Sequence, residues 1–211
     1  MWHFWYLEET MILQQHDDDP SLHGIPMDED AFERLIAGET SYKYELIDGM
    51  LYDMTGGSSP KHSDIAGQIE FELKLQLGRK GPCRVHHEQY VAIPGHTPLC
   101  PDVVLTCDRG DWDDGKTSRP YRIQSPLIVV EVLSPSTKKR DRATKFALYQ
   151  LCPTLEVYIL ASQHEPRIEV YRKANEWQQE IFASGQTVHL DQLNLELAVD
   201  KIYEGVFDTE L

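Results

Sequence analysis

Apolar residues recur with a helical period in two segments of the chain, and cap residues mark a third helix. A spacing of four residues predicts an amphipathic helix that ends at Gly78, with its apolar positions at Ile65, Ile69, Leu73 and Leu77. Acidic residues ahead of an apolar pattern predict a shorter helix over 28–36. A third helix is predicted from Lys139 to Leu151, because turn and cap residues occupy 134–137 and Pro153 follows its end.

Strand-like runs fill the spaces between these helices. Residues 44–54 form two short runs around Asp48-Gly49, which predicts a hairpin. Further strands are predicted over 83–85, 89–93, 103–105, 127–133, 156–160, 167–171 and 177–182, with a short element over 199–206. The uniformly apolar run 127–130 is typical of a central strand covered on both faces. The order of elements predicts a mixed α/β or α+β fold, a mixed β-sheet flanked by helices.

The length and the ends of the pattern predict the domain organisation. A chain of 211 residues suits one domain with a sizeable core, predicted over 26–211, preceded by an N-terminal arm over 1–25 that lacks a sustained period. No apolar stretch approaches the roughly 20 residues that cross a bilayer. The opening residues lack the basic and apolar regions of a signal peptide. We therefore expect a cytoplasmic protein with no membrane contact.

The cysteines do not form a closely spaced pair. They stand at positions 83, 100, 107 and 152, and we interpret them as reduced thiols. The weaker alternative is a zinc site that uses Cys100 and Cys107, which flank a predicted strand.

The formal net charge of -15 argues against a protein that coats nucleic acid without specificity. The charge is unevenly distributed, however, because the segment from Glu131 to Tyr149 carries five basic and two acidic residues. This segment is either the solvated start of a helix or a patch that faces phosphate.

Two carboxylates stand at unusual places in the apolar strands. Asp102 precedes the strand over 103–105, and Glu131 lies inside the run 127–133, where burying an unpaired charge is costly. If these strands are antiparallel neighbours, both carboxylates lie at one edge of the sheet. Such a pair suits Mg²⁺ or Mn²⁺, and the backbone carbonyl of Val132 could supply a third ligand.

The helix that follows brings a cation toward this pair. Asp141, Lys145 and Tyr149 are spaced four residues apart and share one helix face. If that face covers the carboxylates, Lys145 can reach a metal-bound water or a scissile phosphate. The alternative is an ordinary exposed ion pair.

Glu45 and His62 are candidates of lower rank. Glu45 precedes the hairpin turn and either adds a carboxylate to the same edge or is a surface residue. His62, at the start of the long helix, either contacts a metal-bound water or phosphate or is merely exposed.

Five motifs together carry a family resemblance. They are residues 44–49 (YELIDG), 59–62 (SPKH), 101–103 (PDV), 129–136 (VVEVLSPS), and Asp141 with Lys145 and Tyr149. Over about residues 27–206, the chain resembles the Uma-type family of restriction-endonuclease-like proteins in the PD-(D/E)XK nuclease superfamily. The resemblance implies a restriction-endonuclease-like core, Mg²⁺-dependent hydrolysis of DNA phosphodiester bonds, and often a homodimer.

The resemblance also assigns roles to individual residues. Asp102 and Glu131 match the superfamily's metal ligands. The chain departs from the general pattern at Leu133, where the lysine of E-X-K is expected, and in this family that lysine corresponds to Lys145. The alternatives are a catalytically inactive nuclease-fold module that binds nucleic acid or a protein, favoured by the acidity and Leu133, and a hydrolase of a small phosphorylated or acyl substrate.

Overall fold

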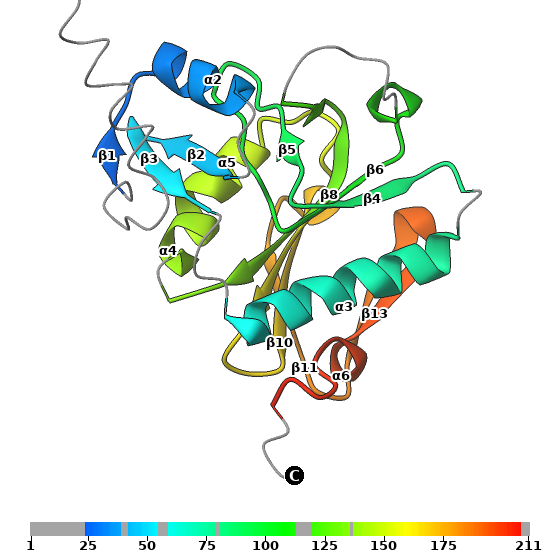
Figure 1. Cartoon of the computed structure of the whole chain (residues 1–211). Coiled ribbons are helices and arrows are strands. Elements are labelled where there is room, and N and C mark those ends of the chain that lie inside the picture. The colour runs from blue at the N-terminus through cyan, green and yellow to red at the C-terminus, as the bar shows by residue number, and fades with distance from the viewer. Residues whose placement is uncertain are drawn as a thin grey trace, which may run out of the picture.

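A six-stranded mixed sheet forms the centre of the protein (Figure 1). The computed structural model describes residues 24–38, 42–54, 59–78, 81–112, 120–135 and 137–207. The strand order is β11-β10-β9-β8-β6-β4, in which β8 and β9 are parallel and all other neighbours are antiparallel. In chain order these strands are β4 (Arg84–His87), β6 (Val103–Thr106), β8 (Pro126–Leu133), β9 (Val157–Ser162), β10 (Arg167–Arg172) and β11 (Gln179–Ala183). The predicted mixed sheet is thereby confirmed.

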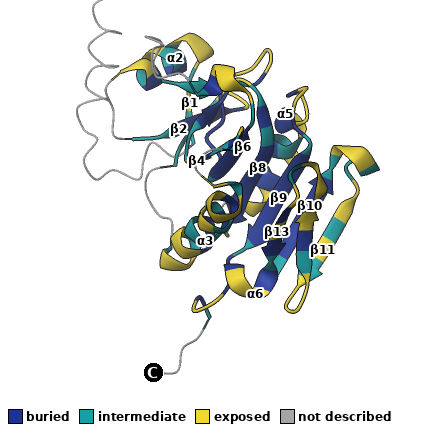
Figure 2. Cartoon of the chain, turned by 90° about the vertical axis from the view of Figure 1, so that its right-hand side faces the viewer, coloured by how far each residue is buried: buried dark blue, intermediate teal, exposed yellow. Residues whose placement is uncertain are grey.

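Helix α3 (Pro60–Leu77) covers one face of this sheet (Figure 2). Its start is set by the Ser59 side chain, which accepts a hydrogen bond from the His62 amide, and by a proline in the first turn. It ends at Gly78, where φ is 65°. The predicted apolar side of the helix packs on alternate residues of β6 and β8. The four-residue period therefore identified the buried side correctly.

The opposite face is covered by one helical segment of three parts. These are α4 (Lys138–Arg140), a π-helical turn (Asp141–Lys145) and α5 (Phe146–Tyr149). Phe146 stacks on Tyr158 of β9 with ring centroids 5.2 Å apart, and Tyr149 is buried beside them. The predicted helix is confirmed, but its middle turn is wider than an α-helix. Such π turns are frequent at functional sites.

A small three-stranded sheet lies beside α4 and α5 (Figure 1). It consists of β1 (Ile25–Pro26), β3 (Met50–Asp53) and β2 (Tyr44–Ile47), and α2 (Glu29–Ala37) packs on it. The β2–β3 turn has positive φ at both Asp48 and Gly49, as its sequence predicted. The first 23 residues of the predicted N-terminal arm lie outside the described part of the chain.

Several short elements were not predicted. They are β7 (Arg122–Ile123), the hairpin β12 (Thr187–Leu190) and β13 (Leu195–Ala198), and the 3-10 turns Arg109–Asp111, Lys173–Asn175 and Asp191–Leu193. The strand predicted over 89–93 is β5 (Tyr90–Val91), which pairs in parallel with β7. The predicted C-terminal element is α6 (Val199–Ile202), which packs with β12, β13 and α3. None of the helices in the described ranges has the length and apolar character to cross a membrane.

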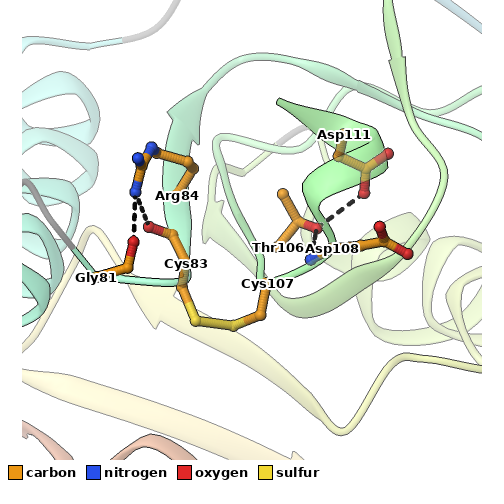
Figure 3. Close-up of a disulfide and its surroundings, with 7 residues drawn as sticks. All are labelled: Gly81, Cys83, Arg84, Thr106, Cys107, Asp108 and Asp111. Carbon is orange, nitrogen blue, oxygen red and sulfur yellow. Dashed lines mark hydrogen bonds between the residues drawn. A yellow bond between two sulfur atoms is a disulfide. The ribbon is translucent and has the colours of Figure 1, made fainter. Parts of the chain in front are cut away.

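A disulfide between Cys83 and Cys107 corrects the prediction that all cysteines are reduced (Figure 3). β4 and β6 pair with Arg84 opposite Thr106, so the cysteines that flank this pair face each other, with Cα atoms 3.9 Å apart. The zinc alternative is also wrong, because Cys107 is bonded to Cys83. Cys100 and Cys152 are buried free thiols.

Candidate active site

Asp102, just before β6, and Glu131 of β8 lie beside each other in the backbone register of the central sheet. β6 and β8 are antiparallel with Val103 opposite Val130, so the residue before β6 comes beside Glu131. The Asp102 Oδ2 atom accepts a hydrogen bond of 2.6 Å from the Val132 amide of β8. The predicted shared edge required antiparallel neighbouring strands, and the structure meets that condition.

Lys145 lies fully buried among carboxylates on the α5 side of this edge. Its Nζ atom is 2.5 Å from Glu131 Oε1, 2.9 Å from Glu45 Oε1 and 4.0 Å from Asp141 Oδ1. The Lys145 side chain has no exposed surface, and Asp141 is 2% exposed. The alternative of an ordinary exposed ion pair is therefore wrong.

Glu45 is also part of this group, and it is not a surface residue. Hairpin strand β2 holds its side chain at 0% exposure. Its Oε1 atom accepts a hydrogen bond of 2.8 Å from the Cys100 amide, in addition to its ion pair with Lys145. Its Oε2 atom is buried and has no hydrogen-bond partner among the described residues.

Two tyrosines fix the helical segment over the site. The Tyr149 hydroxyl donates to Glu131 Oε1 at 3.0 Å, so Lys145 and Tyr149 converge on the same oxygen, as their shared face predicted. The Tyr158 hydroxyl of β9 donates to the Asp141 carbonyl at 3.0 Å, inside the π turn. The role of Tyr158 was not predicted, since its strand pattern alone does not reveal a contact with the helical segment.

His62 approaches Asp102 from the α3 side of the sheet. Its Nε2 atom is 3.4 Å from Asp102 Oδ2, and both side chains are 15% exposed. The Val132 backbone, predicted to supply a third metal ligand, also lies close enough to His62 to raise its pKa.

The charges of this group perturb its pKa values. Burial lowers the pKa of Lys145, but Glu131, Glu45 and Asp141 outweigh that effect and raise it, so the ammonium stays protonated. Burial raises the pKa of Glu131, and the carboxylates around it add to this while Lys145 opposes it. Burial lowers the pKa of His62, but its hydrogen bond to Asp102 and the charge of that carboxylate leave it raised overall.

The donor set fits a divalent cation held by few protein ligands. Three carboxylates face Lys145, a fourth from Asp102 lies beside Glu131, and one oxygen of Glu45 has no partner within the described ranges. No group of three or more His, Cys, Asp or Glu residues in those ranges is arranged to hold a metal. Mg²⁺ usually binds through one or two carboxylates and retains water. Asp102 and Glu131 match this number of carboxylates.

Leu133 occupies the position where the general nuclease pattern has lysine. Its side chain lies in the core beneath α5 and the residue is 4% exposed. Lys145, from the helical segment, brings its ammonium to Glu131 instead.

A mixed sheet flanked by helices, with acidic residues at one strand edge, is the restriction-endonuclease-like fold. The chain belongs to the Uma2 family, described as "Putative restriction endonuclease", whose model matches residues 29–200. It is similar to two proteins of Synechocystis sp. strain PCC 6803. Uncharacterized protein slr1290 is 36% identical over 170 residues, 78% of this chain and 85% of that protein. Uncharacterized protein sll1609 is 26% identical over 141 residues, 66% and 77% of the two chains.

A solved structure supports the fold independently. It is titled "Crystal structure of a putative nuclease belonging to DUF820 from Anabaena variabilis ATCC 29413". The TM-score is 0.70 at 20% sequence identity, and the match covers 86% of this chain and 99% of that one.

Proposed function

We propose that this protein is a Mg²⁺-dependent endonuclease that hydrolyses phosphodiester bonds in DNA. The observation that carries the proposal is a buried lysine between two glutamates, at the sheet edge where Asp102 meets Glu131. Burying so many charges is costly, and perturbed buried charges of this kind gather at functional sites. Membership of a restriction endonuclease family adds support for a nucleic acid substrate.

Asp102 and Glu131 would hold the cation, with the Val132 carbonyl as a third donor. Mg²⁺ was the prediction from the sequence, and Mn²⁺ shares its preference for oxygen ligands. When bound, such an ion polarises the phosphoryl oxygen and lowers the pKa of a coordinated water. Because β6 and β8 are hydrogen-bonded neighbours, the backbone positions of these ligands are fixed relative to each other.

The residues around Lys145 hold a buried positive charge at the proposed centre. Glu45 and Glu131 hold the ammonium in place and maintain its protonation. A cation fixed in a site of low dielectric stabilises the charge that develops on a phosphate during hydrolysis. We propose that His62, which lies 3.4 Å from Asp102, contacts the water or the phosphate.

Cleavage of supercoiled plasmid and of a single-stranded oligonucleotide tests the proposal. We expect cleavage with MgCl₂ or MnCl₂ and none with EDTA. Lys145→Arg retains the charge at the site, whereas Lys145→Met removes it. Lys139→Met, at an exposed position of α4, is the matched control and should retain full activity. Each variant is compared at a temperature where circular dichroism shows it folded.

The outcome also distinguishes the alternatives. Metal-independent binding of DNA without cleavage would favour an inactive nuclease-fold module. Hydrolysis of a small phosphate ester, without binding or cleavage of DNA, would favour a hydrolase of small phosphorylated or acyl substrates. Cleavage that persists unchanged in Lys145→Met would contradict the proposed centre.

We also propose a homodimer formed through α3 and β4. A hollow of about 770 Å³ lies along them, beside Phe71 and Leu75, which are 56% and 62% exposed. β4 is an edge strand of the central sheet, open to pairing. The hollow is also lined by Glu70, Lys74 and Arg84, so residues of both charge signs lie on a surface that a second copy would meet with the same surface.

Light scattering after size exclusion tests the dimer. The wild type is expected at twice the chain mass of 24.3 kDa, and Leu75→Glu at the mass of one chain. Leu151→Glu is the control, because Leu151 is also exposed but lies away from α3 and β4. A wild type that runs as a single chain would refute this proposal.

A further inference from the structure

Arg140, the last residue of α4, has two guanidinium nitrogens without a hydrogen-bond partner among the described residues. Its Cζ atom lies 3.9 Å from the centroid of the Tyr52 ring, so the cation stacks on an aromatic face. Its Nε and Nη2 atoms are buried, and neither has a hydrogen-bond partner within the described ranges. These two nitrogens form one edge of the guanidinium, which presents two donors to a single acceptor group.

In Arg142, two residues further along, both nitrogens of the same guanidinium edge donate hydrogen bonds. Its Nε and Nη2 atoms donate to Glu169 at 3.1 Å and 2.6 Å. A carboxylate paired in this bidentate way is an ordinary partner of an arginine guanidinium. Arg140 has no such carboxylate among the described residues, and buried donors without a partner are rare in proteins. The unpaired edge therefore needs an explanation.

The position of Arg140 relates it to the proposed catalytic group. Tyr52, under its guanidinium, is the cross-strand partner of Glu45 in the β2–β3 hairpin. Glu45 contacts Lys145, and Arg140 immediately precedes Asp141, which also faces Lys145. The unpaired edge is therefore next to the carboxylate group and not on a remote surface.

We propose that Arg140 binds a backbone phosphate of the nucleic acid, adjacent to the phosphate that is cleaved. The inference rests on the proposed function and names a binding residue for that same site. A planar guanidinium matches two phosphate oxygens, and the Tyr52 ring fixes its plane. Arg140 is partly exposed, so this residue can be reached from solvent.

Salt dependence of DNA binding separates this role from a structural one. The probe is a fluorescently labelled duplex oligonucleotide in EDTA, read by anisotropy. Each phosphate contact contributes about 0.9 to the slope of log K against log salt. We expect Arg140→Gln to reduce the magnitude of that slope by about 0.9, the value for one phosphate contact, and to weaken binding about tenfold at fixed salt. Arg140→Lys should restore much of the slope but not the affinity, because lysine lacks the fork.

Lys139→Gln is the matched control, since it removes one charge from the same helix at an exposed position. An equal loss of slope in Lys139→Gln and Arg140→Gln would overturn the proposal, because the effect would then be one of total charge. An unchanged slope in Arg140→Gln would overturn it as well. Unfolding by urea, followed in parallel, shows whether either variant has lost structure.

The outcomes for Arg140 and for the nuclease are distinguishable. A wild type that cleaves DNA, with Arg140→Gln binding normally, refutes the Arg140 site alone. A wild type that binds DNA through Arg140 but never cleaves it refutes the nuclease and retains the phosphate site. A wild type that binds no DNA at all refutes both.

Discussion

Replacement of Lys145 by methionine removes the ammonium that Glu45 and Glu131 contact. Methionine has a similar length and no charge, so the change leaves the carboxylates buried without their counter-ion. Breaking a buried ion pair by removing one partner costs about 3–5 kcal/mol. For a chain of this size we expect the melting temperature to fall by about 6–20 °C.

Urea denaturation of four proteins measures the coupling directly. They are the wild type, Lys145→Met, Glu131→Gln and the double variant. In the two proteins that carry Glu131→Gln, the glutamine amide oxygen can still accept a hydrogen bond from the Tyr149 hydroxyl. We expect the double variant to be more stable than the sum of the single losses predicts, by about 1–3 kcal/mol. Lys139→Met, on the exposed side of α4, should stay within about 0.5 kcal/mol of the wild type. A loss below about 1 kcal/mol for Lys145→Met, with additive single effects, would refute the buried contact.

Three further predictions concern the rest of the fold. Asp28→Ala removes the side chain that accepts the first-turn amide of α2, and should cost about 1 kcal/mol in urea denaturation; no loss would mean that the cap contributes nothing. Burial raises the pKa of Glu169, but Arg142 outweighs it and leaves the pKa lowered, so stability is lost as the pH falls from about 4.5. In Glu169→Gln, the free energy of unfolding should fall less between neutral and acidic pH than in the wild type. An unchanged fall would contradict the lowered pKa of Glu169. Replacement of Cys83 and Cys107 by alanine removes a disulfide between residues 24 positions apart, and should lower the free energy of unfolding by about 3 kcal/mol. An unchanged melting temperature would show that the disulfide adds no stability.

The elements predicted best were those whose local chemistry agrees with their packing. α3 combines a four-residue apolar period with a serine cap at its start and Gly78 at its end. The turn at Asp48-Gly49 needs positive φ, which these residues adopt readily. The hairpin of β12 and β13 was missed because its four-residue strands are short and bury only two apolar positions each.

Features that depend on register or long-range contact could not be predicted from local pattern. The pairing of Cys83 with Cys107 follows from the alignment of β4 and β6, which spacing along the chain does not reveal. The π turn over Asp141–Lys145 has no distinct apolar period.

Asp102 and Glu131 were recognisable in the candidate site because carboxylates are rare in apolar strands. The burial of Glu45 was less predictable, since it depends on how the small hairpin packs against the helical segment that carries Lys145. Its signal in the sequence is similar to that of Glu131, a glutamate flanked by apolar residues, but in a shorter run.

The sharpest test of the nuclease proposal is the rate of Mg²⁺-dependent DNA cleavage by Asp102→Asn. Asparagine retains the shape of the side chain and an oxygen for the Val132 amide, so the fold should persist while the charge is lost. Asp191→Asn, at an exposed turn, is the matched control. We predict a loss of about 10²–10³-fold in Asp102→Asn and none in the control, as expected when electrostatic stabilisation of the transition state is removed. Equal cleavage rates in the wild type and Asp102→Asn would contradict the proposed centre.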